Sequence, residues 1–462
     1  MRNFLRPVNK LPPEILSHIA RYVIKDDEDD AISVVPLTHV CRYWRETIIS
    51  TPEIWALVSD KNEDMTAVCL QRARAAPLEI TLEMPLSSSF PDIFAPYFQN
   101  IRTLVVYSLP AIEDLTSVFP NFPQSMPNLR SLELERVWDG RREQRIDPFE
   151  PFIPALEELL LSCIPLFPSL LRLGTLTEFS IDDTPFDLPL DTLLDFLEGN
   201  RSLERTTLGI YFVDPSLLRS QRRTAMRNQL RYLSIDCRDP GDAQALISSI
   251  PLRKGADLWI HLRTERTTLD DFLPYVSAAR ISNPPSSTSF QLNHGPYSKH
   301  IMLDGPDGKL SFSGLSDVSF AGLAVLPLAN VREVRLNHRK GTTVNALKPP
   351  VFYPSYFPAL ELLTVGYTDV LDTLSALLSN SPPSPSLKTI GFLDCDLSED
   401  FMKELTRFAS ERQNIPPSTW LHRVQIIHSD GVFPSAASIR RLREYVKVVE
   451  VRMEDAFSKD LT

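Results

Sequence analysis

The sequence predicts an α/β protein in which a small all-helical N-terminal module precedes a long array of short parallel strands and helices. Two observations predict this architecture. Apolar residues recur at helical spacing within the first 55 residues, and a six-residue pattern, L-x-x-L-x-L with conservative replacements, returns along most of the remaining chain. The 462 residues suffice for two or three domains or for one elongated array.

The first helix is predicted over residues 11–23. Pro12 and Pro13 suit the start of a helix, where a backbone N–H has no partner within the helix. Four apolar residues then recur at helical spacing and form a stripe: Ile15, Leu16, Ile19 and Val23.

A second helix is predicted to end at Thr51-Pro52, because proline disfavours a helical conformation in the residue before it. Trp55 follows, a large side chain that needs a pocket. The apolar stripe of this helix consists of Leu37, Val40, Cys41, Trp44 and Ile48.

Together these segments resemble an F-box. Both halves of the motif occur in order: Leu11-Pro12-Pro13-Glu14-Ile15-Leu16 with Ile19, then Val40-Cys41-Arg42-Tyr43-Trp44-Arg45, then Thr51-Pro52-Glu53-Ile54-Trp55. The resemblance covers about a tenth of the chain. It implies an F-box domain at residues 1–60 that docks onto the adaptor subunit of an SCF (cullin-RING) ubiquitin ligase and, through the adaptor, onto a cullin.

The resemblance also implies which residues contact the adaptor or support that surface. They are Leu11, Pro12, Ile15, Leu16, Ile19, Val40, Trp44 and Trp55. The alternative is a plain helical cap in which Trp44 and Trp55 are core residues.

Two neighbouring segments complete the N-terminal part. The acidic stretch at residues 25–30 is interpreted as a solvated loop, because it lacks the ligand alternation of a calcium loop. A linker or cap helix at 61–77 ends at Pro77 and leads into a strand at 78–82. This continuation resembles one that is common in fungal F-box proteins.

The repeated pattern begins at Ile101, Leu129, Leu156, Leu176, Leu230, Val331, Leu360, Leu387 and Leu421. A unit of about 20–29 residues with this core is a leucine-rich repeat, whose apolar face is buried only when neighbouring units stack. Residues 78–462 are therefore predicted to form an irregular leucine-rich-repeat solenoid, a curved array. The unit at 387–397 is the most complete, with Cys395 in the ninth position.

Several segments of the array have their own predictions. Helices are expected at 190–197 and at 398–408, the latter with Ser398 as N-cap. The repeat frame is expected to fail after Leu203. An irregular insertion is expected at about 280–315, with a hairpin turn at Gly305 and Gly308. A helix and a strand at 435–452 suit a C-terminal cap.

Composition excludes several function classes. The net charge of −11 argues against a nucleic-acid partner, which would require a basic patch. No apolar run reaches the roughly twenty residues of a membrane span, so no membrane partner is expected. Five scattered cysteines favour a reducing compartment, so the expected location is cytoplasmic or nuclear.

The sequence offers no recognisable catalytic site, and we expect no enzyme, cofactor or metal. The eight histidines lack metal-ligand spacing, and the sequence around Gly305 and Gly308 lacks the glycine interval of a phosphate loop. Cys163, Cys237 and Cys395 end repeat strands, where a small buried residue is the simpler interpretation than a nucleophile.

What remains is a binding surface. Side chains that flank the central leucine of each strand should point to the exposed sheet face, and five of them form a candidate substrate face: Glu133, Glu158, Glu178, Arg335 and Arg423. The early face is acidic and the late face mixed, which favours a ligand that is basic where it meets the early repeats. The other interpretation is that these charges only keep the sheet soluble.

The sequence thus predicts a substrate-recognition subunit of an SCF ubiquitin ligase that binds an unidentified protein. The alternative is a repeat scaffold or inhibitor without a ligase role. A weaker alternative is an enzyme with its site at 240–330.

Overall fold

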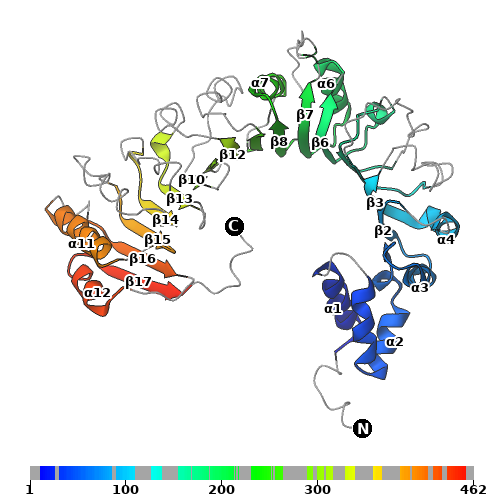
Figure 1. The fold of residues 1–462 in the computed structure, drawn as a ribbon, viewed down its shortest axis with the longest axis horizontal. Helices are drawn as coiled ribbons and strands as arrows, with labels where there is room; N and C mark the ends of the chain where they lie inside the picture. The colour runs from blue at the N-terminus through cyan, green and yellow to red at the C-terminus, as the bar shows by residue number, and fades with distance from the viewer. Residues whose placement is uncertain are drawn as a thin grey trace. The chain divides into compact units, whose positions relative to one another are not determined.

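A computed structural model gives the fold (Figure 1). It describes residues 11–26, 31–85, 90–109, 126–137, 155–167, 169–186, 188–212, 214, 217, 230–250, 252, 255–263, 289–294, 299–305, 308–315, 328–338, 357–366, 386–395, 398–414, 420–428 and 434–453.

The chain divides into two units, each taken by itself below. Unit 1 comprises residues 1–221 with 227–229, and unit 2 comprises 222–226 with 230–462. The helices of unit 1 are α1 Pro13–Asp26, η3 Ala31–His39, α2 Arg42–Ser50, η4 Pro52–Ile54, α3 Glu63–Ala73, α4 Phe90–Phe94, η5 Ala95–Asn100, η6 Leu170–Arg172 and α6 Leu190–Gly199. Its strands are β1 Leu57–Ser59, β2 Leu78–Glu83, β3 Ile101–Leu109, β4 Ser131–Arg136, β5 Glu158–Ser162, β6 Glu178–Phe186 and β7 Arg205–Phe212.

The strands of unit 1 form a parallel sheet in sequence order, β1 to β7. The pattern leucines fall into two registered rows on one face of the sheet. The first row is Val58, Ile80, Leu104, Leu132, Leu159, Phe179 and Thr206, and the second is Leu82, Val106, Leu134, Leu161, Ile181 and Leu208. Every member is at most 2% exposed, so each strand buries its leucines against its neighbours.

The expected loss of frame after Leu203 is wrong. In β7 the pattern is Leu203, Thr206 and Leu208, all buried, and Thr206 aligns with Phe179 of β6. Threonine fills a leucine position here, which hides the frame in the sequence although the backbone register is kept.

The helices of unit 1 that cover the sheet lie on the side of the buried rows. Figure 1 shows α3, α4 and α6 on the same side of the strands. Phe179 of β6 meets Phe196 of α6 edge to face, with ring centroids 4.9 Å apart. Asn200, at the end of α6, joins this helix to the residues before β6, because its side chain accepts from Leu176 N and donates to Phe196 O.

Unit 2 has a sheet with one interruption. Its helices are α7 Pro240–Ser249, η8 Leu328–Asn330, α11 Glu399–Gln413 and α12 Ala436–Leu442. Its strands are β8 Tyr232–Cys237, β9 Asp257–Leu262, β10 Ser289–His294, β11 Lys299–Gly305, β12 Gly308–Leu315, β13 Glu333–His338, β14 Leu362–Gly366, β15 Thr389–Leu393, β16 Arg423–His428 and β17 Val448–Met453. Strands β13 to β17 are parallel and in sequence order.

The insertion forms three sheet strands. The order is β9, β12, β11, β10, β13, in which β11 is antiparallel to both its neighbours while β12 runs parallel to β9 and β10 parallel to β13. An antiparallel three-strand meander has parallel outer strands, so it fits between two parallel strands without reversing the sheet. The predicted hairpin is confirmed, since Gly305 pairs with Gly308.

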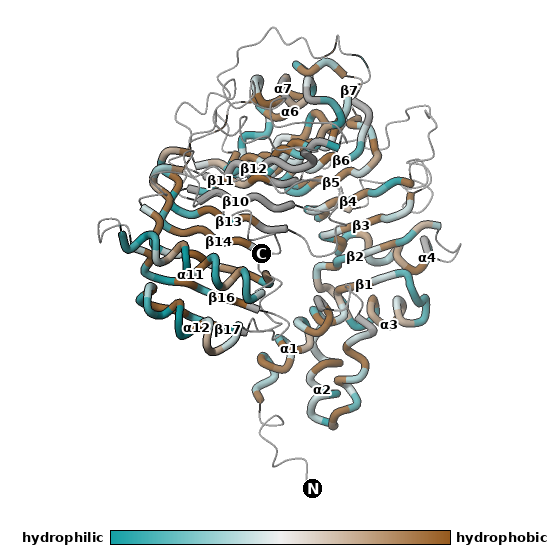
Figure 2. The backbone as a smooth tube through the Cα atoms, turned by 60° about the vertical axis from the view of Figure 1, so that its left-hand side comes forward, coloured by the Kyte–Doolittle hydropathy of each residue, from teal (hydrophilic) through white to brown (hydrophobic). Residues whose placement is uncertain are grey.

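Other predicted elements of the array are present. The side chain of Ser398 caps α11 by accepting from Phe401 N at 3.2 Å, and Phe401 packs edge to face on Phe392 of β15. Helix α12 and strand β17 form the predicted C-terminal pair. Figure 2 shows hydrophobic residues recurring along these strands, with α11 and α12 beside them.

The predicted second N-terminal helix is partly wrong. Leu37 lies in η3, and α2 begins only at Arg42, because Cys41 is extended with φ −162° and ψ 173°. The break is stabilised by side chains: Thr38 Oγ1 donates to Val35 O, and Arg45 Nε donates to Thr38 O. The expected acidic loop begins later than predicted, because α1 extends to Asp26, and residues 27–30 lie outside the described residues.

The helical module and the sheet are not separate domains at the predicted boundary. Strand β1, which lies before residue 60, pairs in parallel with β2, so the sheet begins within the predicted N-terminal domain. The predicted cap helix is α3, with the Asn62 side chain accepting from Met65 N, and it is followed by β2 as expected.

Candidate functional site

Helix α1 carries two apolar lines. Leu16, Ala20 and Ile24 recur every four residues and are at most 1% exposed, so this line packs into the helical module. Ile15, Ile19 and Val23 form a second line one position earlier, in which Ile15 is 47% exposed and the other two are half-buried. The single stripe expected from the sequence is therefore a buried line beside one that reaches solvent.

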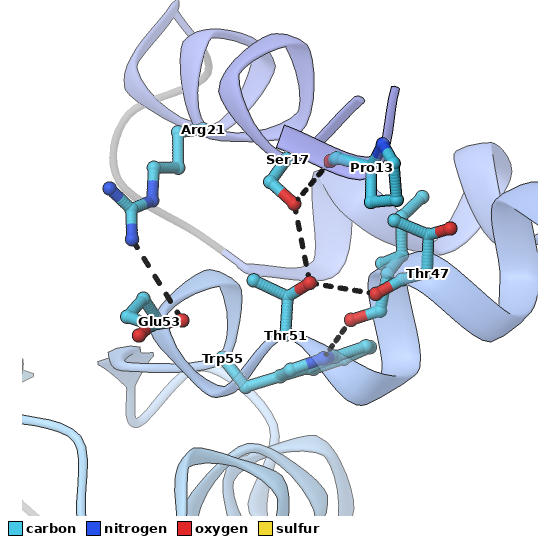
Figure 3. A network of polar contacts seen from close by, with 8 residues as sticks. Pro13, Ser17, Arg21, Thr47, Thr51, Glu53 and Trp55 are labelled. Atoms are coloured by element: carbon cyan, nitrogen blue, oxygen red, sulfur yellow. Dashed lines mark hydrogen bonds and ion pairs between the residues drawn. The ribbon is translucent and has the colours of Figure 1, made fainter. Parts of the chain in front are cut away.

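A polar network holds α1 against the end of α2 (Figure 3). Ser17 Oγ donates to Pro13 O at 2.8 Å and lies 3.2 Å from Thr51 Oγ1. Thr51 Oγ1 donates to Thr47 O at 2.7 Å. The contact between Ser17 and Thr51 joins the second turn of α1 to the residue that follows α2, and it therefore helps to set the angle at which α1 presents its outer line.

Trp55 forms the floor of the module. Its side chain is 0% exposed, and its Nε1 donates to Ile48 O at 2.9 Å (Figure 3). The Arg72 guanidinium of α3 lies 4.3 Å from the centroid of the Trp55 ring, a cation–π contact. The side chain of Trp55, which lies just before β1 in the chain, thus joins α2 to α3.

The segment between η3 and α2 contributes a second exposed apolar residue. Val40 is 46% exposed, whereas Trp44, one turn later, is 7% exposed. The Trp44 indole nitrogen is buried without a hydrogen-bond acceptor among the described residues. Tyr43 donates from its hydroxyl to Leu11 O at 2.9 Å and so ties α2 to the residues before α1.

The eight predicted adaptor residues fall into two groups. Pro12, Ile15 and Val40 are exposed and Leu11 and Ile19 are half-buried, so these five have accessible surface. Leu16, Trp44 and Trp55 are buried and can only support that surface.

Two exposed apolar residues were missed. Tyr22 of α1 is 65% exposed and Ile49 of α2 is 37% exposed. Tyr22 lies seven residues after Ile15 and three after Ile19, so helical spacing alone could have placed it near the outer line. The sequence does not show which of the adjacent residues Ile48 and Ile49 is exposed. In the structure Ile48 is buried and Ile49 is not.

The predicted substrate-face residues of unit 1 lie on the sheet face opposite the buried rows. Glu158 and Glu178 are directly paired on β5 and β6, and Glu133 lies in the next outward row, beside Leu160. Burial, followed by the nearby charge of Glu135, raises the pKa of Glu133, while a hydrogen bond from Tyr107 lowers it in part.

Arg335 and Arg423 lie on the corresponding face of unit 2, where charges offset one another. Arg335 Nε is 2.6 Å from Glu333 Oε1. Arg423 and Arg452 lie 3.8 and 3.3 Å from the carboxylate of Glu450, which also accepts a hydrogen bond from Gln425. The outward face of unit 2 therefore carries both signs of charge, and its acidic and basic side chains pair with one another.

The cysteines at strand ends are in surroundings that disfavour thiolate. Burial, and then Asp183, raises the pKa of Cys163, and burial raises that of Cys237 well above its ordinary value. Cys395 Sγ donates to Val365 O of the preceding strand at 3.1 Å. Among the described residues, no group of three or more His, Cys, Asp or Glu side chains could hold a metal ion.

None of the described helices combines the length and the hydrophobicity that crossing a membrane requires. A search of curated proteins found no match. A scan against family models matched the family F-box-like over residues 8–60, which contain α1, α2 and the Trp55 floor. The chain therefore carries an F-box-like domain at its N-terminus, a type of domain associated with binding to an SCF adaptor.

Proposed function

We propose that this protein is the substrate-recognition subunit of an SCF ubiquitin ligase, in which the helical module binds the adaptor and the sheet binds the target protein. The observation that carries the proposal is the outer line of α1 within the F-box-like segment. Ile15, Ile19 and Val23 leave apolar surface in contact with water although the neighbouring line of α1, at positions 16, 20 and 24, is buried in the module. Surface of this kind is characteristic of a protein interface.

We further propose that the strands form a leucine-rich-repeat array. The registered rows of buried leucines support it, because each strand buries its pattern residues only against its neighbours. The Cys395 thiol supports it too: it bonds to a carbonyl of the preceding strand from the ninth repeat position.

In this function the chain does no chemistry. It holds a target near the charged E2 that other ligase subunits supply, and it thereby raises the effective concentration of the target's lysines. The raised pKa values of Cys163 and Cys237 agree with this, since a nucleophilic cysteine needs its thiolate. The five cysteines form no disulfide, which also suits the cytosol or nucleus.

The test is co-purification with an SCF adaptor. The double variant Pro12→Ala/Ile15→Ala removes two exposed side chains, so the fold should be unaffected. Each interface anchor typically contributes about 2 kcal/mol, so we expect the affinity for the adaptor to fall by a factor of 100 or more.

The matched control is Val137→Ala, which removes an apolar side chain that is 54% exposed after β4. It should bind the adaptor as the wild type does. Undiminished binding of the double variant would refute the adaptor role of α1 and favour a repeat scaffold or inhibitor whose helices only cap the sheet.

A further inference from the structure

The outward face of β2 to β6 in unit 1 carries carboxylates on four of its five strands, β2, β4, β5 and β6. Among the described residues, seven carboxylates lie on this face, beside the guanidinium of Arg205 on β7: Glu79, Glu83, Glu133, Glu135, Glu158, Glu178 and Asp182. The row at the strand starts is mixed, and there Arg130 pairs with Glu157. The excess of acidic side chains is therefore found on the outward face of the strands and not in the row at the strand starts.

These carboxylates are close to one another by construction of the sheet. Neighbouring strands lie about 4.8 Å apart, and Glu158 and Glu178 are direct partners in register. Glu133 and Glu135 are two residues apart on β4 and so point to the same side. The nearby charge of Glu135 contributes to the raised pKa of Glu133, which indicates repulsion that a cation would relieve.

The corresponding face of unit 2 shows that such charges can be offset within a sheet. There Glu333 and Glu450 each contact arginine on the same face. In unit 1 an ion pair joins Glu178 to Arg205 of β7 at 3.7 Å. Among the described side chains on the outward face of β2 to β6, the carboxylates carry an excess of negative charge that an external basic group would offset.

The same face also offers surface that suits the stems of basic side chains. Val105 and Leu160 are half-buried in the row that contains Glu133, and Tyr107 of β3 is 36% exposed. Lysine and arginine place their methylene stems on apolar side chains, and their charged ends over aromatic rings. An acidic face with apolar and aromatic positions fits an extended basic segment better than it fits a free metal ion.

We propose that the outward face of β2 to β6 binds a lysine- and arginine-rich segment of the target protein. The inference rests on the proposed role as a substrate receptor and names the class of substrate. Carboxylates on adjacent strands bind alternate basic side chains, and Val105, Tyr107 and Leu160 contact their stems.

The test uses the full chain and a fluorescein-labelled decapeptide of alternating lysine and serine. The face variant is Glu133→Gln/Glu135→Gln/Glu158→Gln. Its control is Glu404→Gln/Glu411→Gln/Glu444→Gln, on and after the helices α11 and α12, which changes the net charge by the same amount. Fluorescence anisotropy at two salt concentrations gives the affinity, circular dichroism gives the fold, and adaptor co-purification is measured in parallel.

We expect the face variant to bind the peptide at least ten-fold more weakly than the wild type, with a smaller salt dependence, while the control loses less than two-fold. Equal losses in the two variants would overturn the proposal, as would a wild type that does not bind the peptide. A wild-type oligomer that the face variant dissociates would assign the face to a second copy of this chain instead. Peptide binding without adaptor binding would refute the ligase role alone, and the reverse result would refute only the basic-segment proposal.

Discussion

The helical module and the strand array use apolar residues in opposite ways. In the array, the residues of the two registered rows of unit 1 are at most 2% exposed, because the row residues of adjacent strands lie side by side and are buried together. The module, only a small part of the chain, contains four of the seven large hydrophobic side chains that are exposed among the described residues: Ile15, Tyr22, Val40 and Ile49.

The difference shows which part is complete without a partner. In a stacked array, the apolar residues of one strand are buried together with those of the next strand. A two-helix module buries one face and has no further layer over the other. The module is therefore the part with apolar surface that a partner could cover, whereas the pattern residues of unit 1 are buried within the chain. Three substitutions test this contrast, in decreasing order of expected effect.

The largest effect is expected at the joint between the two parts. Trp55→Ala removes a fully buried ring together with its bond to Ile48 O and its contact with Arg72. We expect a loss of about 3–5 kcal/mol in the free energy of unfolding, measured by urea denaturation, and loss of adaptor binding. The control Trp420→Ala, at a side chain that is 38% exposed, should cost far less. A loss below about 1 kcal/mol in the free energy of unfolding of Trp55→Ala would mean that the Trp55 side chain is not part of a tightly packed core.

A substitution in the array should separate stability from adaptor binding. Leu132→Ala opens a cavity between Leu104 and Leu159, and we expect a loss of about 3 kcal/mol in the free energy of unfolding. Adaptor affinity at a temperature where the variant is folded should be unchanged, because the module is untouched. The control is Val105→Ala in the outward row, with a loss under about 1 kcal/mol. Loss of adaptor binding by folded Leu132→Ala would contradict the division of roles.

The smallest effect is electrostatic and depends on pH. Since the pKa of Glu133 is raised on folding, the folded state binds more protons between the unfolded and the folded pKa, and stability falls as pH rises through that window. Glu133→Gln removes this loss. We expect the variant to match the wild type below about pH 4 and to be more stable by up to about 0.5 kcal/mol at pH 7. Thermal unfolding from pH 3.5 to 7 measures it, and a variant that is less stable at pH 7 would show that the carboxylate is favourably paired.

The repeat pattern in the sequence placed nine of the seventeen described strands, β3 to β6, β8 and β13 to β16, because a leucine every two or three residues specifies both the strand and its buried face. It failed where another residue takes the leucine position, as Thr206 does in β7. Spacing also could not reveal that β10 and β12 exchange places in the insertion, since strand order depends on pairing between distant segments.

The candidate site divides in the same way. The sequence by itself determined that residues 11–55 are amphipathic and that Glu133, Glu158 and Glu178 share a sheet face, because both follow from the periods of a helix and a strand. Only the tertiary structure decided that Leu16 faces inward and Ile15 outward, and that Arg335 and Arg423 have acidic partners while Glu133 has an acidic neighbour. Whether a side chain is buried or paired with an opposite charge depends on the segments that pack against it. The periodicity of one segment carries no information about which segments those are.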